Sequence, residues 1–194
     1  IYTGKKVVIY QGGIKAGRGL TKLLSAMEIV IQKENKVLFV IVGGEIDNSG
    51  WNEKTKRFLA KYKDNFITTG WIEHSKLAPF LVHANVGIIM FKPTHYNNII
   101  GLPNKLFEYI ACGLPVISSE MPEVSKIINS TKTGILVNPN NPEEIANSIL
   151  KILDKSQNEI YKANSKKYAN SFVWEKNELT LIRLYQKLSH SKSP

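Results

Sequence analysis

The sequence predicts an α/β fold: a mostly parallel sheet of about six strands with helices on both faces. Two observations indicate it. Short, nearly continuous apolar runs alternate with longer segments whose apolar residues recur at helical spacing. Glycines directly follow the first two of these runs, as they do where a strand ends in a loop. The chain has 194 residues, of which 43% are hydrophobic and 22% charged, so it is long enough for a sizeable core. We therefore expect residues 1–194 to form a single domain.

The first predicted strand, residues 7–11, leads into a glycine-containing loop. The loop GGIKAGRG comes close to a phosphate-binding P-loop, but Arg18 replaces the lysine and Gly19 replaces the serine or threonine. The dinucleotide motif GxGxxG is also incomplete, because position 22 is Lys22. These departures argue against a metal-assisted NTPase. An arginine can still hold phosphate oxygens in pairs, although a tight turn with an exposed Arg18 explains the same residues.

The remaining segments continue the alternation of strands and helices. Further strands are predicted at residues 37–42, 66–70, 86–91, 115–119 and 134–138. Helices are predicted at residues 20–31, 52–62, 75–83, 142–153, 157–170 and 175–188. Residues 92–102 show no sustained periodicity, which is typical of a ligand-facing loop. His95 lies in this loop, where a single histidine is more often a surface residue than an acid or base.

Residues 101–115, GLPNKLFEYIACGLP, contain the helix on which the candidate site depends. Pro103 favours a helix start, because its missing N–H costs nothing at the first helical position. At about 100° per residue, the apolar and polar residues separate onto two sides. The side expected to face the core carries Leu106, Phe107 and Ile110. The side left free for chemistry carries Asn104, Lys105 and Glu108. The helix N-terminus beside that free side favours an anion such as phosphate, although an ordinary amphipathic helix would show the same pattern.

Several loops are expected at one edge of the sheet, because ligands of open α/β sheets bind at the carboxyl ends of the strands. Trp71 and Ile72 follow the third strand, where they would flank a nucleotide base or simply pack against the core. The glycine loop with Arg18, the turn at residues 43–44, the loop at residues 92–102 and the turn at Glu120 belong to the same edge.

The net charge of +10 favours anionic partners without choosing among nucleotides, anionic lipids and nucleic acid. The lysines are spread along the chain, so we expect no nucleic-acid partner. Cys112 is the only cysteine, which excludes an intrachain disulfide and favours a reducing, cytoplasmic compartment. We expect no protein-bound metal, because His74, His83 and His190 lack ligand spacing and no CxxC or HExxH motif is present.

Neither a membrane-spanning run of roughly 20 apolar residues nor a signal-peptide pattern appears in the sequence. The chain starts at Ile1 and runs almost at once into a strand, so we expect a domain taken from a longer protein.

The order of short motifs resembles a known family. The motifs are YQGG at 10–13, Arg18-Gly19-Leu20, VIVGG at 40–44, GWI at 70–72, LPNKLFEYIACGLPVI at 102–117 followed by Glu123, and GILVNPNNPEEIA at 134–146. Together they closely resemble the C-terminal half of a GT-B fold glycosyltransferase of the retaining family 4 type. The resemblance covers nearly the whole chain, and its most specific part is NKLFEYIACGLPVI.

This resemblance implies a Rossmann-like domain that binds a nucleotide-diphosphate sugar and faces an N-terminal domain, absent here, that holds the acceptor. By position, Glu108 would be the second glutamate of the family's E-x7-E motif and would bind the ribose hydroxyls, which a carboxylate can accept in pairs. Arg18 matches the basic residue against the diphosphate. The other matching positions are Trp71 and Ile72 beside the base, and Leu102, Pro103, Asn104 and Lys105 at the phosphates.

Two positions depart from the family pattern. Ile100 stands where the first glutamate of E-x7-E contacts the donor sugar, so sugar recognition falls to other groups such as Asn97 or Asn98. Gly13 stands near the family's first basic residue, which leaves Arg18, with Lys15, to meet the diphosphate.

The expected reaction is glycosyl transfer for glycan or polysaccharide synthesis, without a metal or other cofactor. Arg18, Lys105 and the helix N-terminus would offset the charge that develops on the departing nucleoside diphosphate. Glycoside hydrolysis is disfavoured, because Glu108 is the only carboxylate between residues 92 and 108. Two alternatives stay open: a GT-B fold sugar-nucleotide epimerase, and a non-catalytic basic domain that docks on an anionic membrane or a partner. Peripheral contact with the inner face of the membrane is compatible with glycosyl transfer, since a basic surface would hold the enzyme near lipid-linked acceptors. We expect the domain alone to be inactive.

Overall fold

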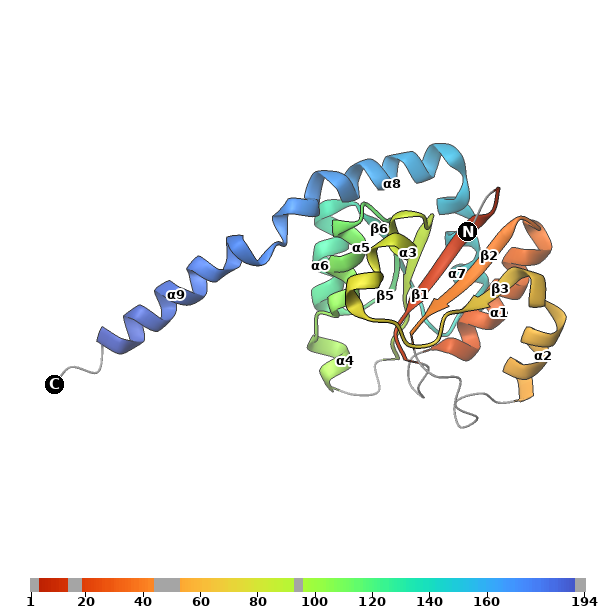
Figure 1. Cartoon of the computed structure of the whole chain (residues 1–194), viewed down its shortest axis with the longest axis horizontal. Coiled ribbons are helices and arrows are strands. Elements are labelled where there is room, and N and C mark those ends of the chain that lie inside the picture. The colour runs from red at the N-terminus through yellow and green to blue at the C-terminus, as the bar shows by residue number, and fades with distance from the viewer. Residues whose placement is uncertain (1–3, 14–18, 44–52, 93–95, 191–194) are drawn as a thin grey trace.

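A six-stranded parallel sheet forms the centre of the protein, in a computed structural model that describes residues 4–13, 19–43, 53–92 and 96–190 (Figure 1). The strand order is β3-β2-β1-β4-β5-β6, and every neighbouring pair is parallel. The strands are β1 Lys6–Gln11, β2 Val37–Val42, β3 Phe66–Thr68, β4 Val86–Ile89, β5 Val116–Ser119 and β6 Gly134–Val137. This is the order of a Rossmann-like sheet, and it confirms the predicted fold class.

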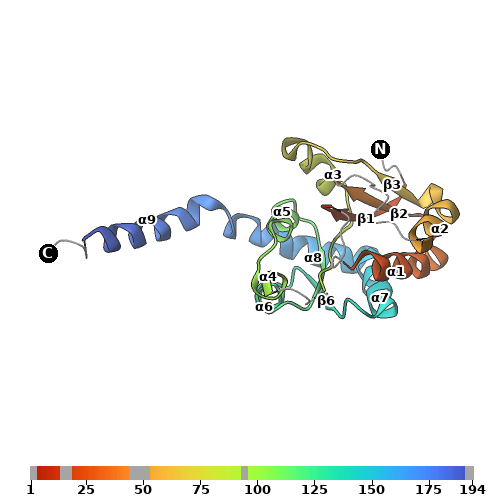
Figure 2. The same cartoon turned by 90° about the horizontal axis from the view of Figure 1, so that it is seen from below.

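Helices cover both faces of this sheet (Figure 2). Their bounds are α1 Leu20–Lys33, α2 Glu53–Lys61, α3 Ala78–Val82, α4 Tyr96–Ile100, α5 Asn104–Ala111, α6 Pro122–Thr131, α7 Pro142–Leu153, α8 Lys155–Tyr168 and α9 Trp174–His190. Apolar residues of α1, α2 and α7 form the core on one face, and those of α3, α5 and α6 form the core on the other. Strand β1 serves both cores, because Val8 and Tyr10 point to the first and Val7 and Ile9 to the second.

Helix α8 lies across the beginnings of β4, β5 and β6 (Figure 1). Its Asn158 Nδ2 donates to the carbonyl of Asn85 at 2.8 Å, just before β4. Farther along the helix, Asn164 and Ser165 donate to carbonyl oxygens that precede β6 and β5. Helix α9 follows and extends away from the body of the protein (Figures 1 and 2).

Two helices were not predicted from the sequence. Helix α6 begins at Pro122 and buries Val124 and Ile128, a spacing of four residues that was available as a signal. The five residues of α4 lie in the stretch interpreted as loop, and none of them is buried. The helix predicted at residues 75–83 is divided into a 3₁₀ turn, His74–Lys76, and α3.

Helix α5 lies directly on β4 because Gly87 has no side chain. A Cβ added to Gly87 would lie 2.5 Å from the ring of Tyr109, which is fully buried. The helix begins at Asn104, one residue later than predicted, because Pro103 is extended with φ −73° and ψ 134° and serves as the N-cap. The close contact fixes where the polar residues of α5 lie at the edge of the sheet.

Candidate functional site

Tyr109 joins α5 to the carboxyl end of β1. The backbone N–H of Gln11 donates to the Tyr109 hydroxyl at 3.1 Å, and that hydroxyl lies 3.5 Å from the carbonyl of Ile88 in β4. Burial raises the pKa of Tyr109 strongly, so its hydroxyl keeps its proton. The residue next to it, Glu108, is therefore held at the point where β1 ends.

Glu108 meets two hydrogen-bonding groups from other parts of the chain. Gln11 Nε2 donates to Glu108 Oε2 at 2.7 Å, and His74 Nε2 lies 2.8 Å from Glu108 Oε1. The side chain of Glu108 is 21% exposed, so its carboxylate remains accessible. Three elements thus converge on one carboxylate: β1, α5 and the 3₁₀ turn after β3.

Lys105 lies on the buried side of α5, and the prediction that it shares a free side with Glu108 is wrong. Its Nζ donates to the carbonyl of Gln11 at 2.7 Å and lies 4.7 Å from the ring centre of Tyr10 and 5.2 Å from that of Phe91. The whole residue is only 9% exposed. The long stem fills space beside two aromatic rings while the ammonium finds an acceptor, which is how a lysine can be buried.

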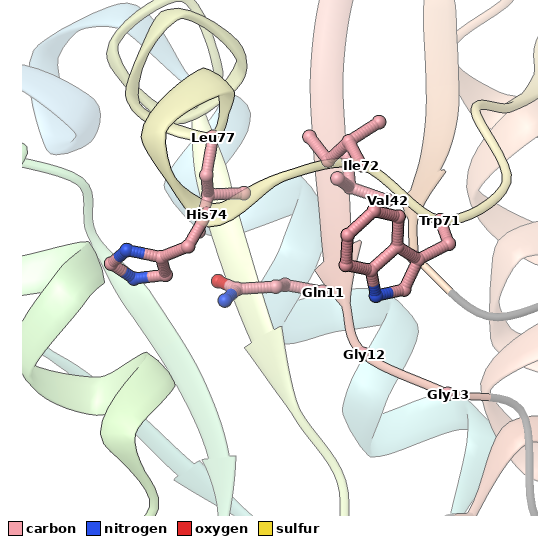
Figure 3. A pocket seen from close by; sticks show the side chains of 9 residues that line it. Gln11, Gly12, Gly13, Val42, Trp71, Ile72, His74 and Leu77 are labelled. Carbon is pink, nitrogen blue, oxygen red and sulfur yellow. The ribbon is translucent and has the colours of Figure 1, made fainter.

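A pocket of about 340 Å³ opens beside this cluster (Figure 3). It is lined by Gln11, Gly12, Gly13, Val42, Gly43, Trp71, Ile72, His74 and Leu77. This volume is within the range of small-molecule sites. Trp71 is 73% exposed and presents its ring at the pocket, while the glycines leave backbone open on the other side (Figure 3). The pocket therefore offers an aromatic surface near a carboxylate.

One buried polar atom at this edge has no hydrogen-bond partner among the residues described. It is Oε1 of Gln11, whose Nε2 donates to Glu108. Because an unpaired buried acceptor is costly, such an atom often marks a place where a ligand or water binds.

The structure brings together part of the predicted site. Gly13, Trp71 and Ile72 line the pocket, and Glu108 reaches it through Gln11 and His74. Asn104 is the first residue of α5, whose N-terminus has no side-chain cap among the described residues, a feature that favours an anion. Leu102 and Ile100 lie just before it and are 42% and 49% exposed. Arg18, Lys15 and His95 fall outside the described residues.

Sequence reasoning did not assign Gln11 and His74 to the site. Gln11 ends β1, and His74 is three residues beyond Trp71 in the turn after β3. The rule that placed Trp71 at the carboxyl edge applies equally to both residues, so the signal was present.

The described part of the chain contains no group of three or more His, Cys, Asp or Glu residues placed to hold a metal ion. Within the same residues, no helix combines the length and apolar character that crossing a membrane requires.

The family model described as glycosyl transferases group 1 matches residues 5–155, well over half of the chain. The chain belongs to this family. The family predicted from the motifs is thereby confirmed.

Curated relatives include glycosyltransferases of several kinds. The chain is 27% identical over 150 residues to 2-deoxystreptamine N-acetyl-D-glucosaminyltransferase of Niallia circulans, covering 77% of this chain and 36% of the relative. It is 24% identical over 192 residues to the capsular polysaccharide biosynthesis glycosyltransferase CapM of Staphylococcus aureus, covering 96% of this chain and 48% of the relative. The chain therefore spans less than half the length of these two relatives.

Among solved structures, the fold matches that of Anabaena HepE in complex with UDP. The TM-score is 0.80 at 14% identity, over 96% of this chain and 50% of HepE. At this identity the likeness establishes the shared fold.

Proposed function

We propose that this chain is the donor-binding domain of a group 1 glycosyltransferase. It binds a nucleotide-diphosphate sugar, whose sugar is transferred to an acceptor in glycan or polysaccharide synthesis. The observation that carries the proposal is the convergence of the Glu108 carboxylate, the uncapped N-terminus of α5 and a pocket of about 340 Å³ on one edge of the sheet. The family membership and the UDP bound by HepE support the same ligand class.

The three parts of the ligand have matching places at this edge. The base lies in the pocket against Trp71 and Ile72, since an exposed aromatic ring offers a stacking surface. The ribose hydroxyls donate to Glu108, which as a carboxylate accepts several hydrogen bonds. The diphosphate lies at the N-terminus of α5, near Leu102, Pro103 and Asn104, with the backbone of Gly13 at the same edge. Arg18 is a further proposed contact, on the basis of its position in the sequence motif alone.

In this proposal the protein assists departure of the nucleoside diphosphate. The bond between the anomeric carbon and the diphosphate oxygen breaks with its electron pair going to the diphosphate. The oxygen of the acceptor hydroxyl forms the new bond to the anomeric carbon, and its proton passes to the departing diphosphate. The α5 N-terminus, Arg18 and the buried charge of Lys105 offset the developing negative charge, at about 3 kcal/mol for a well-placed group. Retention of configuration and independence from a metal are parts of the proposal that come from the family resemblance.

Calorimetric titration with UDP, GDP and ADP tests the proposal. We expect one of them to bind, and Glu108→Gln to weaken it about tenfold, since a hydrogen bond to a charged acceptor is worth about 1.5–3 kcal/mol. Glu159→Gln is the matched control, because Glu159 is exposed on α8, away from the pocket. If none of the nucleotides binds, or if both variants bind as the unchanged chain does, the assignment of the site is wrong.

We also propose that a second, acceptor-binding domain faces this one and contacts α9. The chain covers 36% and 48% of its two relatives, which leaves room for such a domain in a longer protein. The exposed apolar side chains of helix α9 are Trp174, Leu179, Leu181, Ile182, Leu184, Tyr185 and Leu188. An apolar helix surface of this size normally has a protein partner.

Replacing Leu184 with Asp tests this contact. In the full-length protein the melting temperature should fall, whereas in the 194-residue chain it should stay the same, because Leu184 is 53% exposed there. Equal melting temperatures in the full-length pair would contradict the contact.

The net charge of +10 favours peripheral attachment to the inner face of an anionic membrane as an addition to donor binding. Flotation with vesicles of phosphatidylglycerol and phosphatidylcholine tests this point. Binding should rise with the anionic fraction and disappear at high salt.

A further inference from the structure

Glu108 is held from two sides by groups that belong to different parts of the fold. Gln11 at the end of β1 donates to Oε2, and His74 in the turn after β3 lies 2.8 Å from Oε1. Each oxygen of a carboxylate accepts two hydrogen bonds, so with respect to the described residues each has one further acceptor position. The two remaining sites suit a pair of neighbouring hydroxyl groups.

His74 itself is an exposed residue on a firmly placed segment. Its side chain is 79% exposed, and its ring points from the 3₁₀ turn toward α5, with the end of the Gln11 side chain beside it (Figure 3). Leu77, just beyond the turn, is 5% exposed and packs into the core, and the N–H of Leu77 donates to the His74 carbonyl at 3.1 Å. The backbone of His74 is therefore fixed, and its imidazole spans the gap between the pocket wall and α5.

We propose that His74 is a positioning residue that, together with Gln11, fixes the plane of the Glu108 carboxylate for the ribose hydroxyls of the donor. The proposal rests on the proposed function, because it assumes that Glu108 binds the ribose. A carboxylate with a single partner rotates about its terminal bond, and arresting that rotation on binding would cost affinity. Two donors placed beforehand on separate oxygens remove most of that cost.

This role predicts an effect that depends on the ribose hydroxyls. Removal of the His74 side chain should lower the affinity for nucleotides that carry both hydroxyls. The affinity for their 2′,3′-dideoxy analogues should stay the same. A residue that only shapes the pocket or supports the fold would change both classes of ligand alike. Gln offers an Nε2 donor at a similar distance from the backbone, so it should restore the positioning where Ala cannot.

The experiment compares UDP, GDP and ADP with their 2′,3′-dideoxy analogues by calorimetry on four chains: unchanged, His74→Ala, His74→Gln and His83→Ala. His83 is the matched control, because it is also an exposed histidine but bonds to the carbonyl of Pro79 and does not line the pocket. We expect His74→Ala to weaken the preferred nucleotide about tenfold and its dideoxy analogue less than twofold, which is the loss of about one hydrogen bond to a charged group. His74→Gln should stay within about threefold of the unchanged chain.

The outcomes separate the two proposals. If the unchanged chain binds nucleotide but His74→Ala has no effect, or weakens both ligand classes equally, the positioning role is wrong and donor binding stands. Tighter binding by His74→Ala would also overturn the role, since it would show that His74 competes with the ribose for Glu108. If the unchanged chain binds none of the nucleotides, the proposed function fails, and the positioning role fails with it.

Discussion

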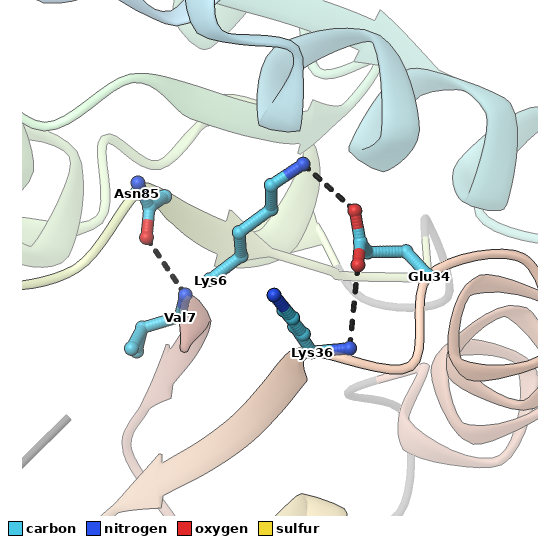
Figure 4. Close-up of polar contacts among 5 residues, drawn as sticks. All are labelled: Lys6, Val7, Glu34, Lys36 and Asn85. Atoms are coloured by element: carbon cyan, nitrogen blue, oxygen red, sulfur yellow. Dashed lines mark hydrogen bonds and ion pairs between the residues drawn. The ribbon is translucent and has the colours of Figure 1, made fainter. Parts of the chain in front are cut away.

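The two edges of the sheet carry similar polar residues but use them differently. At the edge where the strands begin, Asn85 pairs with Val7 in both directions: the Val7 N–H donates to Asn85 Oδ1 at 2.7 Å, and the Asn85 N–H donates to the Val7 carbonyl at 2.9 Å (Figure 4). Glu34 accepts from Lys6 Nζ at 2.8 Å and from the Lys36 N–H at 3.3 Å (Figure 4). Helix α8 lies across part of this edge, and Asn158 donates to Asn85.

At the edge where the strands end, the polar groups converge on open space. Gln11 and His74 meet at Glu108, a pocket of about 340 Å³ opens beside them, and Gln11 Oε1 lacks a partner in the described residues. A glutamate with two hydrogen-bonding neighbours is thus found at both edges, as Glu34 and as Glu108. Residue type alone therefore does not identify a binding site. The decisive difference is whether the polar groups adjoin space that a ligand can enter.

Gly87→Ala should have the largest effect, because it disturbs the contact that positions α5. The new Cβ would lie 2.5 Å from the buried Tyr109 ring, and overpacking of this kind should lower the unfolding free energy by roughly 3 kcal/mol. Nucleotide affinity should fall as well, since Glu108 moves with the helix. Urea denaturation and calorimetry measure the two effects. Gly4→Ala is the control for a Cβ in open space, with a cost of about 1 kcal/mol from its φ of 74°.

Asn85→Ala should lower the stability of the protein without changing its nucleotide affinity, because it alters only the edge where the strands begin. It leaves the N–H of Val7, which is fully buried, without its acceptor, so the unfolding free energy should fall by about 2 kcal/mol. Nucleotide affinity should not change, because Asn85 lies at the opposite edge from the pocket. Asn177→Ala on the exposed helix α9 is the control and should cost less than about 0.5 kcal/mol. A loss of affinity in Asn85→Ala would contradict the separation.

Lys105→Met should lower nucleotide affinity with little change in stability, the opposite of what we expect for Asn85→Ala. Removing the buried charge should lower the affinity for UDP about tenfold, which corresponds to about 1.4 kcal/mol. The affinity for uridine should not change, because uridine carries no phosphate. Stability should change less than in Asn85→Ala, because relief from burying a charge offsets the lost hydrogen bond to Gln11 and the contacts with Tyr10 and Phe91. Paired titrations with UDP and uridine measure the difference. Equal losses for both ligands would contradict an electrostatic role.

Glu34→Gln should have the smallest effect, which is present at neutral pH and disappears in acidic solution. The hydrogen bond from Lys6 lowers the pKa of Glu34 below its ordinary value of 4.5, so the folded state favours the ionised form. This stabilisation is present above the unfolded pKa and is lost as the pH falls through the folded pKa. The variant should therefore lose at most about 1 kcal/mol at neutral pH and show a shallower decline below about pH 4.5. Urea titrations from pH 3 to 7 measure it, and Lys6→Met should remove the same pH-dependent part.

Much of the fold was predictable because most strands lie in nearly continuous apolar runs. Strand β2 was predicted with its observed bounds, Val37–Val42, and α7 likewise, Pro142–Leu153. Both segments have clear local signals: six buried apolar residues in the strand, and Pro142 in the first turn of the helix. Helix α6 was missed although its apolar spacing was present. The sequence did not predict α4 or the 3₁₀ turn His74–Lys76, because such short elements have too few residues to show a helical period.

The sequence by itself determined the order of the strands along the chain, most of the helices and the motif block around Glu108, because these depend on local propensity and spacing. The tertiary structure decided which side of α5 is buried, and so placed the Lys105 ammonium at the carbonyl of Gln11, where β1 ends. It also brought Gln11, His74 and Glu108 together, although 63 positions separate the first two along the chain and 34 separate the last two. The physical reason is that hydrogen bonds between distant residues depend on how strands are ordered in the sheet and on where Gly87 lets a helix approach it. A local sequence pattern contains neither the strand order in the sheet nor the place where the helix approaches the sheet.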